Sequence, residues 1–214
     1  MGGRGASSGG EGWTGGGGGL SSADILSTTS LVSAREGKQQ EVDEVLQTFK
    51  DINDEYGYII NDIEIATLSK KGADTMAYYD GSNIAVNAPY FDKTTMEYVY
   101  AKTVERGYHP SQGNKTALQA VASHELGHAL TDKAIAKIGS KLGKQDGAEA
   151  ILKEAQKQAK HKGKLADMAS KISGYAKESA RECIAEAFAD VYCNGKKSTK
   201  ESQAIVNVMN KYLK

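Results

Sequence analysis

The chain has 214 residues, which is long enough for one sizeable hydrophobic core and suggests a single domain. Its 27 basic and 27 acidic residues cancel, and this balance argues against a basic nucleic-acid-binding protein. With 39% hydrophobic residues and only two prolines, the composition excludes a collagen-like or wholly disordered chain. The sequence has no apolar run of about 18 residues, so we expect no membrane-spanning helix.

The first part of the chain differs in composition from the rest. Of the 24 glycines, 11 fall within residues 1–22, where ordering the backbone costs much conformational entropy. We therefore expect a flexible Gly/Ser-rich tail over residues 1–33, followed by a folded domain over 34–214. Because the tail has no apolar stretch of the kind found in signal peptides, we do not expect it to be a secretory signal peptide.

The first half of the folded part is predicted to hold one helix and then a small sheet. Apolar residues at spacings of three and four predict a helix over 36–56. A change to β-branched residues predicts a strand over 58–68. Two further strands, 76–79 and 83–87, flank Asp80-Gly81, which is a strong signal for a hairpin turn.

The rest of the chain is predicted to be helical, apart from a loop over 107–113. The predicted helices, in chain order, are 94–106, 116–138, 148–160, 179–192 and 198–213. The last of them has Ser198 or Thr199 as its N-cap. A helix, a small sheet and then several helices predict an α+β fold.

One motif carries chemistry. His124-Glu125-Leu126-Gly127-His128 lies within the predicted helix 116–138. Histidines four residues apart lie on one helix face, so both imidazoles can reach one zinc ion at about 2.0–2.1 Å. Glu125 lies beside that face, where it would act as a general base on the attacking water rather than as a ligand. The alternative is a pair of solvent-facing histidines on an amphipathic helix.

A third protein ligand is expected from a later helix. Glu182, Glu186 and Asp190 are spaced by four and form one acidic stripe among small and apolar residues. Carboxylates in such surroundings are costly unless they are paired or bind a metal. Two pairs fit a metal ligand followed four residues later by an outer acid, meaning an acid that hydrogen-bonds a ligand histidine. In one register Glu182 is the ligand and Glu186 the outer acid, and in the other Glu186 is the ligand and Asp190 the outer acid. A solvated helix face is the alternative to both.

The two motifs resemble those of the zincin metallopeptidases, of the gluzincin-like kind. His-Glu-x-Gly-His, then Tyr175, Glu182 and Glu186 at offsets of seven and four, is similar to the catalytic domain of anthrax lethal factor. Related domains are encoded by phages and other mobile elements. The resemblance covers about residues 75–193. It implies a compact zincin-like α+β fold with a small mixed or antiparallel sheet, an active-site helix and a helical C-terminal half.

The resemblance also implies roles for individual residues. It selects Glu182 as the third ligand of Zn²⁺, because the tyrosine offset matches this glutamate. Glu186 would then accept a hydrogen bond from a ligand histidine and fix its tautomer. Tyr175 would help to hold the oxyanion, and a tyrosine that only packs in the core is the alternative.

The implied protein is a zinc-dependent endopeptidase that acts on a polypeptide, with neither nucleic acid nor membrane as a partner. It would be encoded by a phage or mobile element and would be cytoplasmic, virion-associated or injected. The alternative is a zinc-stabilised phage structural protein, or a toxin-like binding module, without catalysis. Residues 84–87 are expected at a sheet edge above the cleft, where an extended peptide can add as a further strand; a plain core strand is the alternative.

The remaining histidines and cysteines are interpreted as outside the site. His109 precedes Pro110 in a loop and is expected to be structural or on the surface, and His161 is expected to be solvated among lysines. Cys183 and Cys193 lie about 15 Å apart on a helix, which is too far for a disulfide, so we expect buried free thiols.

Charge is distributed unevenly along the chain. Residues 1–110 hold 9 basic and 16 acidic residues, and residues 111–214 hold 18 and 11. A Lys-rich helical insert is expected over 133–177, between the two metal-binding helices, with 11 basic and 4 acidic residues. Its charges predict a solvated helix face, or a docking surface for an acidic partner.

Overall fold

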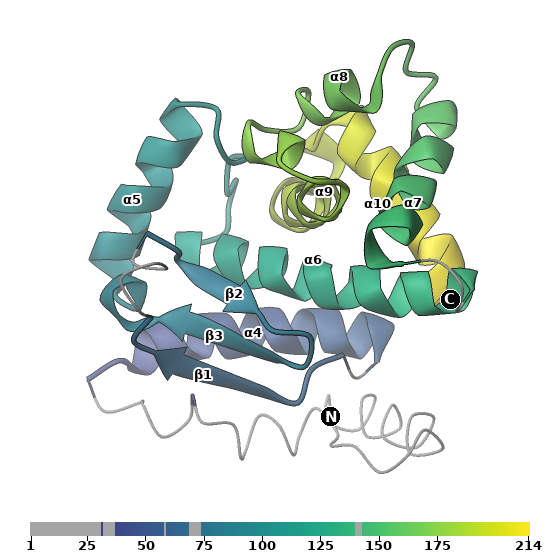
Figure 1. Ribbon diagram of the computed structural model, residues 1–214. Helices are drawn as coiled ribbons and strands as arrows, with labels where there is room; N and C mark the ends of the chain where they lie inside the picture. Colours follow the sequence, from purple (N-terminus) through teal and green to yellow (C-terminus); the bar gives the residue numbers. More distant parts are fainter. Residues whose placement is uncertain (1–30, 32–36, 58, 69–73, 140–142) are drawn as a thin grey trace.

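The computed structural model describes residues 31, 37–57, 59–68, 74–139 and 143–214. Helix α6 (Ala117–Ile138) runs through the middle of the molecule. The three-stranded sheet and helix α4 (Gln39–Tyr56) lie on one side of it, and most of the C-terminal helices lie on the other (Figure 1). The architecture is α+β, as expected.

Helix α4 covers the predicted segment 36–56 except for its first three residues. Its apolar side is buried, including Val42, Val45 and Phe49. The helix ends where Gly57 takes a φ of 73°, a conformation that favours glycine. Because α4 packs directly against α6, it supports the helix that carries His124 and His128.

The sheet is mixed, with the strand order β1-β3-β2. Strands β1 (Asp62–Ala66) and β3 (Asn83–Asn87) are parallel, and β2 (Ala77–Tyr79) is antiparallel to β3. The predicted hairpin is confirmed, since the Asp80 carboxylate in its turn accepts the Ser82 and Asn83 N–H groups at 2.8 and 2.7 Å.

The expected place of residues 84–87 at the sheet edge is wrong. They belong to β3, which lies between the other two strands, and the edge beside α6 is β2. The hairpin fixes only the β2–β3 pairing. The position of β1 depends on pairing with a segment some twenty residues away, such as Asp62 with Asn83, which local sequence patterns do not report.

Helices α5 and α6 begin at side-chain caps. Helix α5 (Lys93–Glu105) starts after Asp92, whose carboxylate accepts the Thr95 N–H at 2.9 Å. Helix α6 starts with a capping box between Thr116 and Gln119. These caps fix the observed starts of α5 and α6, which lie within one residue of the predicted starts.

The C-terminal part of the chain is helical, as expected. It contains α7 (Lys144–Gln158), the short α8 (Leu165–Ala169), α9 (Ala180–Asn194) and α10 (Lys200–Leu213). Helix α7 starts four residues before its predicted beginning, and α8 was not predicted. Of the two N-cap candidates for α10, Thr199 is the cap, and its hydroxyl accepts the Ser202 N–H at 3.0 Å.

Two expectations about individual residues need correction. The predicted tail, 1–33, lies outside the described residues except for Leu31, which is fully buried in the core. A domain boundary at residue 34 therefore leaves out a core side chain.

His161 is not solvated, because its side chain is only 10% exposed and its Nδ1 lies 3.5 Å from Oε1 of Glu201. The backbone turns back after α7, where the His161 N–H donates to the Gln156 carbonyl, and this brings the ring against α10.

Both cysteines are free and buried, as expected. Burial raises the pKa of the Cys183 and Cys193 thiols to about 12. Across the part of the chain that the structure describes, no helix combines the length and the apolar character needed to cross a membrane.

Candidate metal centre

His124 and His128 of α6 converge with Glu182 of α9. The Nε2 atoms of the two histidines lie 3.1 and 3.3 Å from the same carboxylate oxygen, Oε2 of Glu182. The three potential ligand atoms all lie within 4.8 Å of one another. The structure therefore brings together the three residues predicted as ligands, close enough to hold a metal ion.

The donor set fits a small divalent metal. Ligand atoms at about 2.0–2.1 Å from a tetrahedral ion are about 3.3 Å apart, close to the two separations between nitrogen and oxygen. Two imidazole nitrogens and one carboxylate oxygen are a known zinc ligand set that leaves a fourth position open. Both Nε2 atoms point to the same oxygen, Oε2 of Glu182, so the three donors converge on one position.

The approach of α9 to α6 depends on Gly127, between the two histidines. A Cβ atom at this position would lie 3.1 Å from Cα of Ala185 and 3.2 Å from Cβ of Phe188. Since one of these contacts is with backbone, a side chain here would require α9 to move away from α6 by a few tenths of an ångström. The crossing brings Glu182, one turn before Ala185, within reach of the histidines.

Glu182 is held in the first turn of α9. The Ser179 hydroxyl caps this helix by accepting the Glu182 N–H at 3.1 Å, and a helix N-terminus favours a negative charge. Burial raises the pKa of Glu182, but hydrogen bonding and charge attraction from His124 and His128 outweigh it. The pKa is therefore held well below its usual range, and the carboxylate is ionised, as a metal ligand must be.

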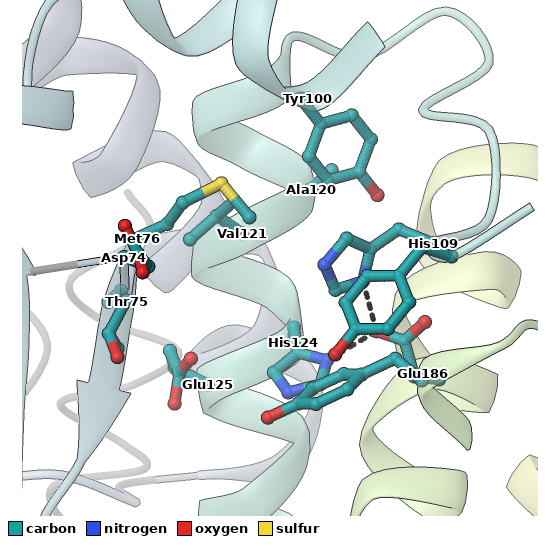
Figure 2. Close-up of a pocket in the computed structure, with 13 residues that line it drawn as sticks. Asp74, Thr75, Met76, Tyr100, His109, Ala120, Val121, His124, Glu125 and Glu186 are labelled. Carbon is teal, nitrogen blue, oxygen red and sulfur yellow. Dashed lines mark hydrogen bonds and ion pairs between the residues drawn. The ribbon is translucent and has the colours of Figure 1, made fainter. Parts of the chain in front are cut away.

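Glu186 lies on the opposite side of the His124 ring and is almost fully buried. Its Oε1 is 2.8 Å from Nδ1 of His124 and 3.1 Å from Nδ1 of His109 (Figure 2). The contact with His124 is a close ion pair that is not aligned as a straight hydrogen bond. Burial raises the pKa of Glu186, but the nearby imidazoles of His109 and His124 outweigh this effect and lower it to about 2.

The same two carboxylates act on His124. Burial lowers the pKa of this histidine, but Glu182 and Glu186, on its two ring nitrogens, raise it well above its ordinary value. Nδ1 of His128 is also buried and has no hydrogen-bond partner among the described residues. The two histidines of the motif are therefore supported differently, and His124 is the one held by an outer acid.

His109 is a site residue that the sequence interpretation missed. It was expected to be structural or on the surface, whereas its side chain is 11% exposed and faces Glu186. Its ring stacks on Tyr100, with centroids 5.6 Å apart and an interplanar angle of 10°. A single histidine in a loop has no periodic signal that could relate it to a glutamate 77 residues later.

Glu125 faces a cavity of about 230 Å³ beside the candidate ligands. In Figure 2, Met76 and its neighbours lie on one side of the cavity and His109 with Glu186 on the other, with Glu125 and His124 between them. Burial raises the pKa of the Glu125 carboxyl, although His124 and His128 oppose this effect. A carboxyl group with a raised pKa therefore adjoins the ligand cluster.

Tyr175 also lines this cavity, in the short helix η3 (Tyr175–Lys177). Its ring lies against His124, with centroids 5.8 Å apart, and its backbone N–H donates to the Tyr108 carbonyl at 2.9 Å. Burial, followed by the charges of nearby glutamates, raises the pKa of its hydroxyl. The structure thus places Tyr175 at the candidate site.

Asp190 lies away from the ligand cluster. Its carboxylate accepts hydrogen bonds from the Asn194 side chain and from the Thr199 N–H, both at 3.0 Å. The hydrogen bond from Thr199 connects the end of α9 to the start of α10. The register in which Glu186 binds the metal and Asp190 is the outer acid therefore has no counterpart in the observed contacts.

Comparisons with known proteins leave the site as the main source of functional information. No family model, curated protein or solved structure matches this chain. The resemblance to the zincins therefore depends on the two motifs and on how their residues are arranged.

Proposed function

We propose that this protein is a zinc-dependent endopeptidase of the zincin type. The observation that carries the proposal is the convergence of His124, His128 and Glu182, with Glu125 beside them at a cavity. Structural zinc sites have four protein ligands, whereas three ligands leave a position for water or substrate. A buried acid next to that open position favours catalysis over a purely structural role.

The chain's own groups account for the proton transfers. Zinc, when bound, supplies a Lewis acid that polarises the peptide carbonyl and lowers the pKa of water to about 7. Glu125 takes the proton of the attacking water and passes it to the leaving amine. Its raised pKa brings the carboxyl closer to the range in which it can do both.

Tyr175 is proposed to stabilise the oxyanion that develops on the substrate. A tyrosine hydroxyl, whose pKa is ordinarily about 10, is protonated at neutral pH and can donate a hydrogen bond, and burial raises the pKa of Tyr175 further. Glu186 is proposed to keep the His124 ring in the tautomer that presents Nε2 to the metal.

The substrate is proposed to be an extended polypeptide that binds along β2. This strand is the sheet edge beside α6, and Ala77 within it lines the cavity next to Glu125. Among the described residues, β2 pairs as a strand only with β3, and the Tyr79 N–H donates to the Glu125 carboxylate. The rest of its other edge can accept a peptide as an added strand. Phage origin, and with it a virion-associated location, is proposed from the resemblance alone.

Glu125→Gln tests the peptidase function. The variant should keep about one zinc ion per chain, because Glu125 is not a ligand, while peptide cleavage should fall about 100- to 10,000-fold. Metal content is measured by atomic spectroscopy and cleavage by mass spectrometry of a peptide library. Glu178→Gln, an exposed position near the site, serves as the control and should stay active.

Zinc content and peptide cleavage of the wild-type protein distinguish an endopeptidase from a non-catalytic, zinc-stabilised protein. If it holds stoichiometric zinc but cleaves none of the library peptides, the endopeptidase proposal fails. The alternative of a zinc-stabilised binding module or structural protein would then be favoured.

A further inference from the structure

We propose that His109 is a positioning residue of the metal centre: its imidazole holds Glu186 in the orientation in which Glu186 supports His124. The inference rests on the proposed metal site and extends it to the loop before α6. It assigns a role to the one histidine near the site that the zinc motif does not contain.

Glu186 is fixed by donors on both of its carboxylate oxygens. Oε1 faces Nδ1 of His109 and Nδ1 of His124, and Oε2 accepts the Ser173 hydroxyl at 2.7 Å. The Ser173 oxygen itself accepts the Ala176 N–H at 3.0 Å, which directs the hydroxyl hydrogen towards Glu186. The carboxylate can therefore satisfy all its partners in only one orientation.

His109 supplies a hydrogen-bond donor to Oε1 of Glu186, with Nδ1 at 3.1 Å. The Glu186 side chain is only 2% exposed, so solvent has little access to it, and an unsatisfied buried charge is costly. Without His109, Oε1 would keep only the poorly aligned contact with His124. The Glu186 carboxylate could then rotate about its hydrogen bond with the Ser173 hydroxyl. The His124 ring would lose its contact with Glu186.

His109 is itself well placed to act as a fixed support. Its ring stacks on Tyr100, whose hydroxyl donates to the Pro110 carbonyl at 3.0 Å. The carbonyls of Gly107 and Tyr108, just before it, accept the N–H groups of residues 174 and 175 at 2.7 and 2.9 Å. The loop that carries His109 is thus bonded to the segment that carries Tyr175.

A role in packing alone is the competing explanation, and two variants of similar size separate it from positioning. Asn and Leu have nearly the same shape, and both remove the stacking on Tyr100. In His109→Asn the amide nitrogen replaces Nδ1 as a donor to Glu186, whereas His109→Leu has no donor. A difference between these two variants therefore reports the hydrogen bond and not the ring.

The experiment measures zinc affinity by competition with a chromogenic chelator, with zinc alone as the probe. Removing an outer-shell partner lowers metal affinity about 10- to 100-fold, so His109→Leu should bind zinc at least about tenfold more weakly, and His109→Asn within about threefold of wild type. If both variants match the wild type, or both are weakened equally, the proposal is overturned. If His109→Leu does not fold, His109→Phe keeps the ring without the donor and is read in the same way.

His161→Leu is the matched control. His161 is also nearly buried and also faces a glutamate, but this glutamate, Glu201, lies on α10 and not at the candidate metal centre. It should lower thermal stability and leave zinc affinity unchanged; a loss of affinity equal to that of His109→Leu would overturn the proposal. In zinc-saturated enzyme, His109→Leu should lower kcat with KM unchanged, whereas a raised KM would indicate substrate contact instead. Zinc affinity does not depend on catalysis, so a wild type that binds zinc without cleaving peptides would overturn only the peptidase function.

Discussion

Three acidic residues spaced by four on α9 have three different surroundings. Glu182 faces both histidines of the motif, Glu186 lies behind one of them, and Asp190 bonds to the start of α10. The spacing correctly indicated a shared helix face. It could not show that this face, about 12 Å long at 1.5 Å per residue, passes from the metal centre to a helix junction.

The ligand assignment predicts an order of zinc loss. Glu182→Ala removes a ligand and should weaken zinc binding by more than the 10- to 100-fold expected for Glu186→Ala, which removes an outer acid. Chelator competition measures both. Asp190→Ala is the control and should keep its zinc affinity. It should lose about 1 kcal/mol of unfolding free energy, because it lacks the hydrogen bond that Asp190 accepts from the Thr199 N–H. The reverse order for the two glutamates would show that Glu186 is the ligand.

The two cysteines should be chemically inert in the native protein. Burial raises the pKa of Cys183 and Cys193 to about 12, and the thiolate is the reactive form. Labelling with iodoacetamide at pH 8, followed by intact-protein mass spectrometry, should be slow without denaturant and complete in urea. Rapid labelling of the native protein would instead reveal local opening of α9, which carries both residues.

At the scale of elements, the crossing of α6 and α9 makes Gly127 sensitive to substitution. Gly127→Ala should cost about 1–3 kcal/mol through overpacking against the Ala185 backbone, partly offset by the better helix propensity of alanine. It should also weaken zinc binding, because α9 carries Glu182. Thermal melts and chelator competition measure the two effects.

Gly147→Ala is the matched control for this substitution. Its Cβ would lie 2.5 Å from the Ile135 side chain, where α7 packs on the far part of α6. We expect a loss of stability with zinc affinity unchanged. If Gly127→Ala keeps full zinc affinity, the helix crossing does not determine the position of the third ligand.

Local signals predicted the helices better than the sheet. Capping residues and apolar periodicity define α6 and α10 within the sequence of each helix, so their ends were predicted to within two residues. The order of the strands depends on which distant segments pair, and β3 was therefore misplaced at an edge. Helix α8 has only five residues, too few for a periodic pattern to develop.

The residues of the candidate site also differ in how far the sequence could predict them. His124, Glu125 and His128 belong to one helical turn, and their proximity follows from helix geometry alone. Glu182 required a spacing argument and a resemblance. His109 reaches the site through a loop, by a contact with Glu186 that no pattern along the chain encodes.

For the whole molecule, zinc should act as a stabilising ligand, because its ligands belong to two helices separated by α7 and α8. At a zinc concentration of about 1,000 times Kd, the gain is about 4 kcal/mol. A domain of this size then gains roughly 8–16 °C in Tm. Thermal melts with zinc and with a chelator test this, and Glu182→Ala should melt at the same temperature in both. An equal Tm for the wild type in both would rule out metal binding by the folded state.

The folded unit should also depend on a residue outside its predicted boundary. Leu31 is fully buried, so Leu31→Ala should cost about 2–5 kcal/mol of unfolding free energy. Leu165→Ala, at a partly buried position, should cost less. Urea unfolding of the two variants measures the difference, and equal costs would show that Leu31 does not contribute to the core.

The contact between Gly127 and Ala185 also limits how this protein can diverge in sequence. In the motif His-Glu-x-x-His the two middle positions can hold any residue. In this protein, however, positions 126 and 127 should differ in their tolerance to substitution. Leu126 is buried among apolar residues and should accept others of similar volume. A side chain at Gly127 would press on the backbone of α9, the helix that carries the proposed ligand Glu182. Among variants that keep zinc binding, position 127 should therefore vary less than position 126.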